Sequence, residues 1–159
     1  MRLLSTTAAA LSLALLASSP ARAEHQCISV HSPIVTTYFL DGCDSPAGIC
    51  TQGTVRIGRQ AATTRFRALT ITPGSSPDVL LYTGELVITT RNGTLTIHDY
   101  GLLQSATGEF SELQKVVAGT HRYKHAHGLL TSQGMATATG FEGTLIGMIC
   151  RVDERGPHR

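Results

Sequence analysis

Two acidic residues, Asp99 and Glu112, are the candidates for catalysis in this 159-residue chain. Both lie in segments rich in β-branched and apolar residues, where a side chain can face the interior of a sheet domain. A carboxyl group among apolar side chains has a raised pKa and can donate a proton or stabilise a charge. Other polar residues considered for the same interior are Glu85, His98, Tyr100 and Glu109. For each of the six, a solvated or hydrogen-bonded structural role is the alternative.

Strand alternation separates His98 from Asp99. Neighbouring residues on a strand point to opposite faces unless a bulge intervenes. If Leu95 and Ile97 pack inside, Asp99 points inward with them and His98 points outward.

Three histidines follow in a short segment: His121, His125 and His127. On one strand face, His125 and His127 could bind a transition metal together with His121, because neutral imidazole is a common ligand. No carboxylate or cysteine completes a recognised ligand spacing, so we interpret the segment as an exposed basic turn and predict no metal.

Composition and motifs exclude several classes of function. The chain has 13 Lys and Arg against 11 Asp and Glu, and two of the basic residues, Arg2 and Arg22, lie in the first 23 residues. The rest is neutral, which argues against nucleic-acid binding. No nucleophile elbow, phosphate-binding glycine loop or metalloprotease helix is present, so hydrolases, kinases and dinucleotide enzymes have no support.

Residues 1–23 are typical of a secretory signal peptide. Arg2 precedes about ten small or apolar residues, and Ala21-Arg22-Ala23 predicts cleavage before Glu24. A retained membrane anchor is the alternative, but the apolar run is shorter than the roughly 20 residues of a membrane span. We therefore expect a secreted or periplasmic protein with no membrane span.

Four cysteines, Cys27, Cys43, Cys50 and Cys150, lie in the part expected to be exported, where an even number favours disulfides. Four cysteines allow three pairings. The turn-rich segment between Cys43 and Cys50 brings these two into range, so Cys27 pairs with Cys150. A zinc site is the alternative, although the spacing does not resemble a zinc ribbon.

The chain from 24 to 151 is expected to be one all-β domain, because Thr, Val and Ile are abundant and glycines recur at short intervals. A helix over Phe110–Val117 is an alternative for one segment, and a polar tail occupies 152–159. Asn92-Gly93 is expected at the centre of a type I′ hairpin turn. The expected strands are Ile34–Leu40, Cys50–Ile57, Thr64–Thr72, Val79–Thr90, Thr94–Leu103, Glu109–Val117, Leu129–Thr139 and Phe141–Arg151.

Eight antiparallel strands joined by short turns must form a closed barrel or a sandwich to avoid open edges. We prefer the barrel, whose interior is just wide enough for side chains or one small ligand.

Several segments in this order resemble secreted microbial proteins with an allene oxide cyclase barrel-like or dirigent-like domain. They are Cys43-Asp44-Ser45-Pro46-Ala47-Gly48-Ile49-Cys50-Thr51-Gln52-Gly53, Tyr82-Thr83-Gly84-Glu85-Leu86-Val87-Ile88-Thr89-Thr90, Gly93-Thr94-Leu95-Thr96, Thr107-Gly108-Glu109-Phe110-Ser111-Glu112 and Gly143-Thr144-Leu145-Ile146-Gly147-Met148-Ile149-Cys150. The chain departs from the family pattern at 119–128, where histidines replace two glycines and a threonine.

The resemblance implies a closed antiparallel eight-stranded β-barrel, commonly a trimer, with a largely apolar cavity and no bound cofactor. In such proteins the cavity steers cyclisation of a reactive fatty-acid epoxide or the stereochemistry of radical coupling. A small apolar ligand is the first hypothesis for function. The second is a non-catalytic extracellular structural or interaction domain whose barrel is filled by its own side chains. A cavity below about 300 Å³ would leave little room for a drug-sized ligand.

Overall fold

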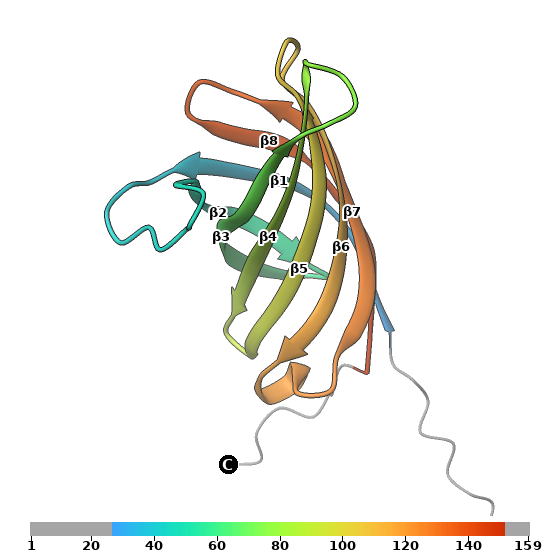
Figure 1. Ribbon diagram of the computed structural model, residues 1–159. Coiled ribbons are helices and arrows are strands. Elements are labelled where there is room, and N and C mark those ends of the chain that lie inside the picture. The colour runs from blue at the N-terminus through green and yellow to red at the C-terminus, as the bar shows by residue number, and fades with distance from the viewer. Residues whose placement is uncertain (1–26, 152–159) are drawn as a thin grey trace, which may run out of the picture.

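Eight strands, each antiparallel to its neighbours, close into a barrel in the computed structural model, which describes residues 27–151 (Figure 1). They follow one another around the barrel in chain order, and β8 pairs with β1. The predicted all-β closed barrel is confirmed, and the sandwich is excluded. The strands are β1 (Cys27–Tyr38), β2 (Cys50–Ile57), β3 (Gln60–Pro73), β4 (Val79–Thr90), β5 (Gly93–Gln104), β6 (Glu109–Gly119), β7 (His127–Ala136) and β8 (Gly140–Cys150).

Two strands, β2 and β4, have the predicted bounds, while β1 begins seven residues earlier than expected. The longer strand includes Pro33, which has no N–H for the ladder. The β1–β2 ladder covers only Val35↔Thr54 to Tyr38↔Thr51. Beyond it, the Arg56 N–H donates to Ser32 Oγ at 2.9 Å, so a side chain replaces the backbone acceptor.

The segment that contains Phe110 and Val117 is strand β6, so the helix alternative is wrong. The hairpin between β4 and β5 forms, but its turn is not type I′. Arg91 and Asn92 connect Thr90 to Gly93, and Asn92 does not have a positive φ. Gly93 has φ of 132°, and a Cβ there would lie 2.3 Å from Thr120 O. Close packing against the β6–β7 connection therefore explains this glycine.

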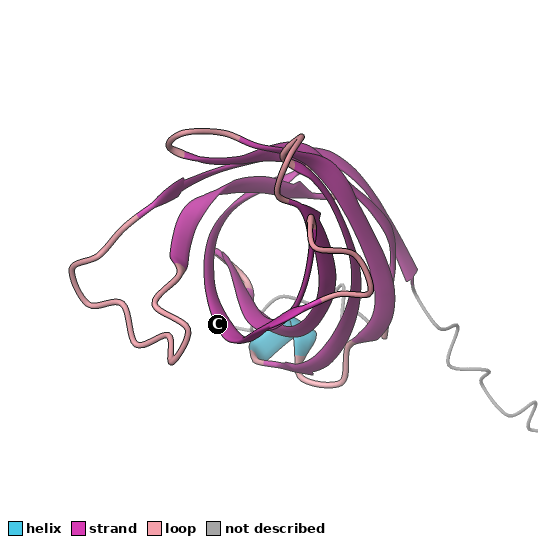
Figure 2. Ribbon diagram, turned by 45° about the horizontal axis from the view of Figure 1, so that its top comes forward, coloured by secondary structure: helices cyan, strands magenta, loops and turns pink. Residues whose placement is uncertain are grey.

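The barrel has two different ends. At the lower end in Figure 1, the connections are residues 58–59, 91–92 and 120–126, and the last contains η1 (His121–Tyr123), a short 3-10 helix. The upper end, which faces the viewer in Figure 2, carries the connections 39–49, 74–78, 105–108 and 137–139. Buried side chains fill the lower half, among them Val30, Ile57, Ile88, Leu95, Ile97, Tyr123, Leu145 and Ile149.

Both predicted disulfides form. Cys27 and Cys150, which are also partners in the β1–β8 ladder, join the first strand to the last across 123 residues of chain. Cys43 and Cys50 close the β1–β2 loop. Disulfides of this kind persist in oxidising compartments, which fits a location outside the cytoplasm.

The predicted signal peptide (1–23) and polar tail (152–159) lie outside the described residues. Within residues 27–151, no helix has the length and apolar character that a membrane crossing requires.

Candidate functional site

A cavity of about 100 Å³ occupies the upper half of the barrel, above the filled lower core. Its walls are mainly apolar and come from several strands, with Ile34, Phe66, Leu80, Leu86, Phe110 and Phe141 among them. Seven polar side chains also line it: Thr36, Thr51 and a hydrogen-bonded group of five, which are Tyr82, Asp99, Glu112, Gln114 and Ser132. The volume is below the ~300 Å³ of a drug-sized pocket and closer to the ~150 Å³ that holds a benzene-sized molecule in other proteins.

Alternation along β5 places Asp99 inside, as predicted. Leu95 and Ile97 are fully buried, Asp99 is 2% exposed, and His98 is exposed on the outer face. On β3, the register shift between Ala68 and Thr70 moves the inward position by one residue, so that Ile71 lines the cavity.

The cavity's polar group is built on a row of residues that are paired across four strands. Tyr82 on β4 is opposite Gly101 on β5, Gly101 is opposite Glu112 on β6, and Glu112 is opposite Ser132 on β7. A Cβ on Gly101 would lie 2.2 Å from Cζ of Tyr82. The missing side chain therefore lets the tyrosine ring lie over β5 and reach the next strand.

Glu112 accepts hydrogen bonds from three neighbours. The Tyr82 phenol donates to Oε1 at 2.7 Å. Gln114 Nε2 donates to Oε2 at 2.9 Å, and the Ser132 hydroxyl donates to the same oxygen. Three donors around one carboxyl group favour its ionised form.

Asp99 has far fewer partners. Gln114 Nε2 lies 3.4 Å from Oδ2, and Oδ1 is buried without a hydrogen-bond partner among the described residues. The Gln114 carbonyl oxygen is also buried and unpartnered. Two buried polar atoms beside the cavity therefore have no hydrogen-bond partner among the described residues, and an unpaired buried polar atom is costly.

Burial raises the pKa of Asp99 well above its ordinary value, and the nearby Glu112 raises it further. Burial also raises the pKa of Glu112, although its three donors oppose the shift. The two groups titrate as a pair. Since Glu112 has the donors that favour the ionised form, the proton of the pair resides mainly on Asp99. Burial and Glu112 together also raise the pKa of Tyr82, which stays protonated.

Burial with few donors thus favours the protonated form of Asp99, whereas the three donors favour the ionised form of Glu112. Two carboxyl groups whose environments differ in this way can divide the roles of proton donor and charge stabiliser.

The other polar residues considered for the interior lie outside it. His98, Tyr100 and Glu109 are exposed. Glu85 is on the outer face of β4, where Arg67 Nη2 lies 3.1 Å from its Oε1.

The histidines do not share a strand face. His121 is in η1, His125 is in the turn that follows, and His127 begins β7; all three are exposed. Among residues 27–151, no three His, Cys, Asp or Glu side chains are grouped closely enough to hold a metal ion.

Sequence reasoning had not identified Tyr82, Gln114 or Ser132 as part of the site. Alternation could have placed Gln114 on the face of Glu112, since both lie on β6 two residues apart. The contacts of Tyr82 and Ser132 depend on the register of three strand pairs, for which the sequence has no local signal.

The scan against protein-family models finds no model that matches the chain. The searches of curated proteins and of solved structures find no significant match either.

Proposed function

We propose that this protein is a secreted barrel of the allene oxide cyclase or dirigent type, which binds a small apolar molecule, or the apolar end of a longer one, through an oxygen-bearing group. The observation that carries the proposal is the pair Asp99 and Glu112 in the wall of a mainly apolar cavity. Burying two carboxyl groups is unfavourable unless their hydrogen bonding is complete or an opposite charge is paired with them. Asp99 has neither full hydrogen bonding nor an ion-pair partner among residues 27–151.

The two unpartnered atoms, Oδ1 of Asp99 and Oε1 of Gln114, indicate which polar group the ligand carries. A hydroxyl oxygen can accept a hydrogen bond from protonated Asp99 while its hydrogen is donated to the Gln114 carbonyl oxygen. Given about 100 Å³ of space, the group that enters is a ring or a short chain.

The same pair supports cyclisation without a cofactor. Asp99 donates a proton to an oxygen of the reacting molecule, and ionised Glu112 stabilises the positive charge that develops nearby. Cyclisation is an isomerisation, so the proton returns to Asp99 before the product leaves. The cavity walls fix the ligand's conformation and thereby the stereochemistry.

The second candidate, a non-catalytic structural or interaction domain, is favoured by the filled lower half of the barrel and the small cavity. Binding of small probes separates the two. Phenol and toluene have similar shapes, but only phenol carries a hydroxyl group. We expect phenol to bind at least about tenfold more tightly at pH 5, measured by saturation-transfer NMR.

Two tryptophan variants test where the probe binds. Leu103 lines the cavity, whereas Leu102 is exposed on the outer face of the same strand. Leu103→Trp should abolish phenol binding, and Leu102→Trp should leave it unchanged. If neither probe binds below about 10 mM, the filled structural barrel replaces the ligand-binding barrel.

Self-association is part of the proposal, because the resemblance implies a trimer. The outer face of β4–β8 has contiguous exposed apolar side chains that another copy can cover. They are Leu81, Tyr100, Leu102, Leu113, Leu129, Ile146 and Met148.

A further inference from the structure

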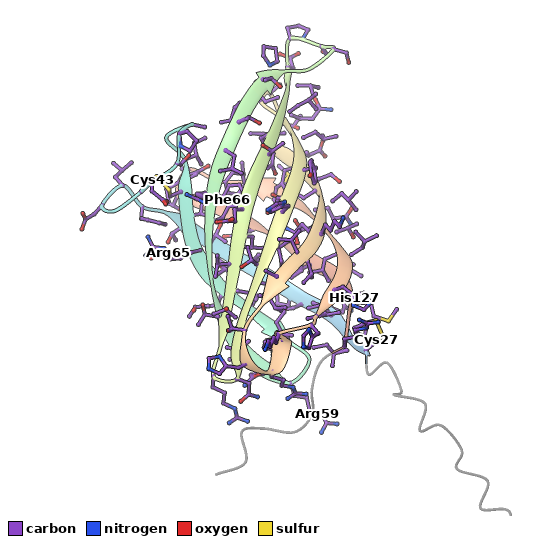
Figure 3. The ribbon with its side chains drawn as sticks, turned by 60° about the horizontal axis from the view of Figure 1, so that its bottom comes forward. Cys27, Cys43, Arg59, Arg65, Phe66 and His127 are labelled. Carbon is purple, nitrogen blue, oxygen red and sulfur yellow. A yellow bond between two sulfur atoms is a disulfide. The ribbon has the colours of Figure 1, made fainter. Side chains whose placement is uncertain are left out.

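The two ends of the barrel differ in charge. The three connections at the lower end, residues 58–59, 91–92 and 120–126, contain no Asp or Glu. Their Lys and Arg residues are Arg59, Arg91, Arg122 and Lys124. Figure 3 shows Arg59 at this end, away from Arg65 and Cys43.

The connections at the upper end have the opposite character. Residues 39–49, 74–78, 105–108 and 137–139 contain Asp41, Asp44 and Asp78 and no Lys or Arg. A nearly neutral chain thus folds into a barrel with a basic end and an acidic end. The charges of the two ends largely cancel in the net charge. That total therefore does not show the positive electrostatic potential at the lower end, which attracts anions.

A groove of about 470 Å³ lies among the three basic connections. Arg59, Arg91 and Arg122 line it, each from a different connection, and none of the described residues that line it is acidic. These arginines also form no ion pair with a described residue, since both ion pairs of residues 27–151 belong to Arg67. We call this groove, with Gln60 and Tyr123 in its wall, the basic groove.

Two buried hydrogen-bond donors of the basic groove have no acceptor among the described residues. One is Nε of Arg122, and the other is Nε2 of Gln60. The Gln60 amide oxygen accepts a hydrogen bond of 3.4 Å from the Tyr123 hydroxyl, which leaves the nitrogen end of the amide unpaired. Buried donors without acceptors are rare in native proteins, and each requires an explanation.

The backbone around these donors is fixed by hydrogen bonds. The Arg122 N–H donates to Asn92 O at 3.2 Å, which ties the β6–β7 connection to the β4–β5 turn. Arg56 Nη2 donates to Arg59 O at 3.0 Å. The backbone that carries Arg59 and Arg122 is therefore held in place, which reduces the backbone entropy lost on binding.

We propose that the basic groove binds a phosphate or sulfate group. Three guanidinium groups match an anion with two charges and several acceptor oxygens better than a single carboxylate. Nε of Arg122 and Nε2 of Gln60 are buried in this structure, so they reach these oxygens only when their side chains turn toward the anion. This site is at the opposite end of the barrel from Asp99 and Glu112, so its failure would not affect the proposed function.

Titration of the purified chain with inorganic phosphate and with sulfate, by calorimetry at low ionic strength, tests the proposal. We expect saturable binding to one site. Arg122→Gln should weaken the binding at least about tenfold, because it removes both a charge and the buried Nε donor. Lys115→Gln, which removes one charge from an exposed position on the outer face of β6, is the matched control and should bind like the unchanged chain.

A second readout separates binding from damage to the fold. Phosphate should raise the urea midpoint of the unchanged chain and of Lys115→Gln, but not that of Arg122→Gln, since a ligand stabilises only a native state that binds it. In the absence of phosphate, all three midpoints should be similar.

The chain's own carboxylates are another source of acceptor oxygens, since Asp153 and Glu154 follow the last described residue. A chain that ends at Arg151 distinguishes the sources. Tighter phosphate binding by this shorter chain would mean that the tail competes for the same groove. Absence of saturable binding in both chains, or equal binding by Arg122→Gln, would overturn the proposal.

Discussion

The phenol of Tyr82, on β4, reaches across β5 and donates a hydrogen bond of 2.7 Å to Oε1 of Glu112, on β6. Strand pairing alone does not bring these residues into contact, because Gly101 lies between them in the ladder. The tyrosine ring passes over the glycine, in the space that a side chain would need.

Gly101→Ala should therefore break the Tyr82–Glu112 hydrogen bond. The added Cβ would lie 2.2 Å from Cζ and 2.5 Å from Oη of Tyr82, so the ring has to move. We expect a loss of about 1–3 kcal/mol in the free energy of unfolding, typical of overpacking. Urea denaturation measures it.

A double-mutant cycle with Tyr82→Ala identifies the cause. Without the ring there is no clash, so Gly101→Ala should have a much smaller effect in the Tyr82→Ala background. Equal effects in both backgrounds would show that the glycine is needed for its backbone and not for the space it leaves.

Stability should fall as pH rises above about 4, because of Asp99 and Glu112. Burial raises the pKa of both groups in the folded state. At pH values between the pKa of a carboxyl group in the unfolded state and its higher pKa in the folded state, the folded protein keeps a proton that the unfolded chain has released. The free energy of unfolding then decreases by about 1.4 kcal/mol per pH unit for each such proton, until the folded pKa is passed.

Asp99→Asn should reduce this pH dependence and raise stability at neutral pH relative to the unchanged chain. Asp41→Asn, at an exposed position, is the control and should leave the slope unchanged. Urea midpoints between pH 4 and pH 8 provide the comparison. A flat profile for the unchanged chain would contradict the protonated state assigned to Asp99.

Asp99 could be placed from the sequence because its position depends only on local alternation with Leu95 and Ile97. The pairing of the cysteines was predictable for a similar reason, since the turn-rich segment between Cys43 and Cys50 left one partner for each remaining cysteine. The type I′ turn was wrong because Thr90 pairs with Gly93, so the two turn residues are Arg91 and Asn92, and neither has a positive φ. Gly93 instead packs against Thr120, 27 residues further along the chain.

The hydrogen bonds around Glu112 could not be predicted, because they depend on how four strands align. A single bulge changes that alignment by one residue. The structure has a register shift on β3, against β4, and another on β6, against β5. From the sequence, only the net charge of the chain could be predicted, not its distribution over the barrel. The separation into acidic and basic ends depends on which connections lie at the same end of the barrel. That grouping is known only once the strands have closed into the barrel.

The two disulfides should differ in their contribution to stability. Cys27–Cys150 closes a loop with a sequence separation of 123 residues, and Cys43–Cys50 one of 7. In the chain-entropy model, replacing the first pair by serine lowers the free energy of unfolding by about 5 kcal/mol, and replacing the second by about 2.5 kcal/mol. Urea denaturation of both double variants checks the order, and an equal loss would contradict the entropic explanation.

Leu113→Glu should convert the proposed oligomer into monomers. Leu113 is 50% exposed on the outer face of β6, beside Tyr100 and Thr131 in the ladders with β5 and β7. A carboxylate there would be buried without a counter-ion when another copy covers the face, and that burial is strongly unfavourable.

Val35→Glu is the control, because Val35 is 49% exposed on β1 outside this apolar face. Sedimentation velocity should show trimers for the unchanged chain and for Val35→Glu but monomers for Leu113→Glu. An unchanged chain that sediments as a monomer would instead mean that the exposed apolar face does not mediate self-association.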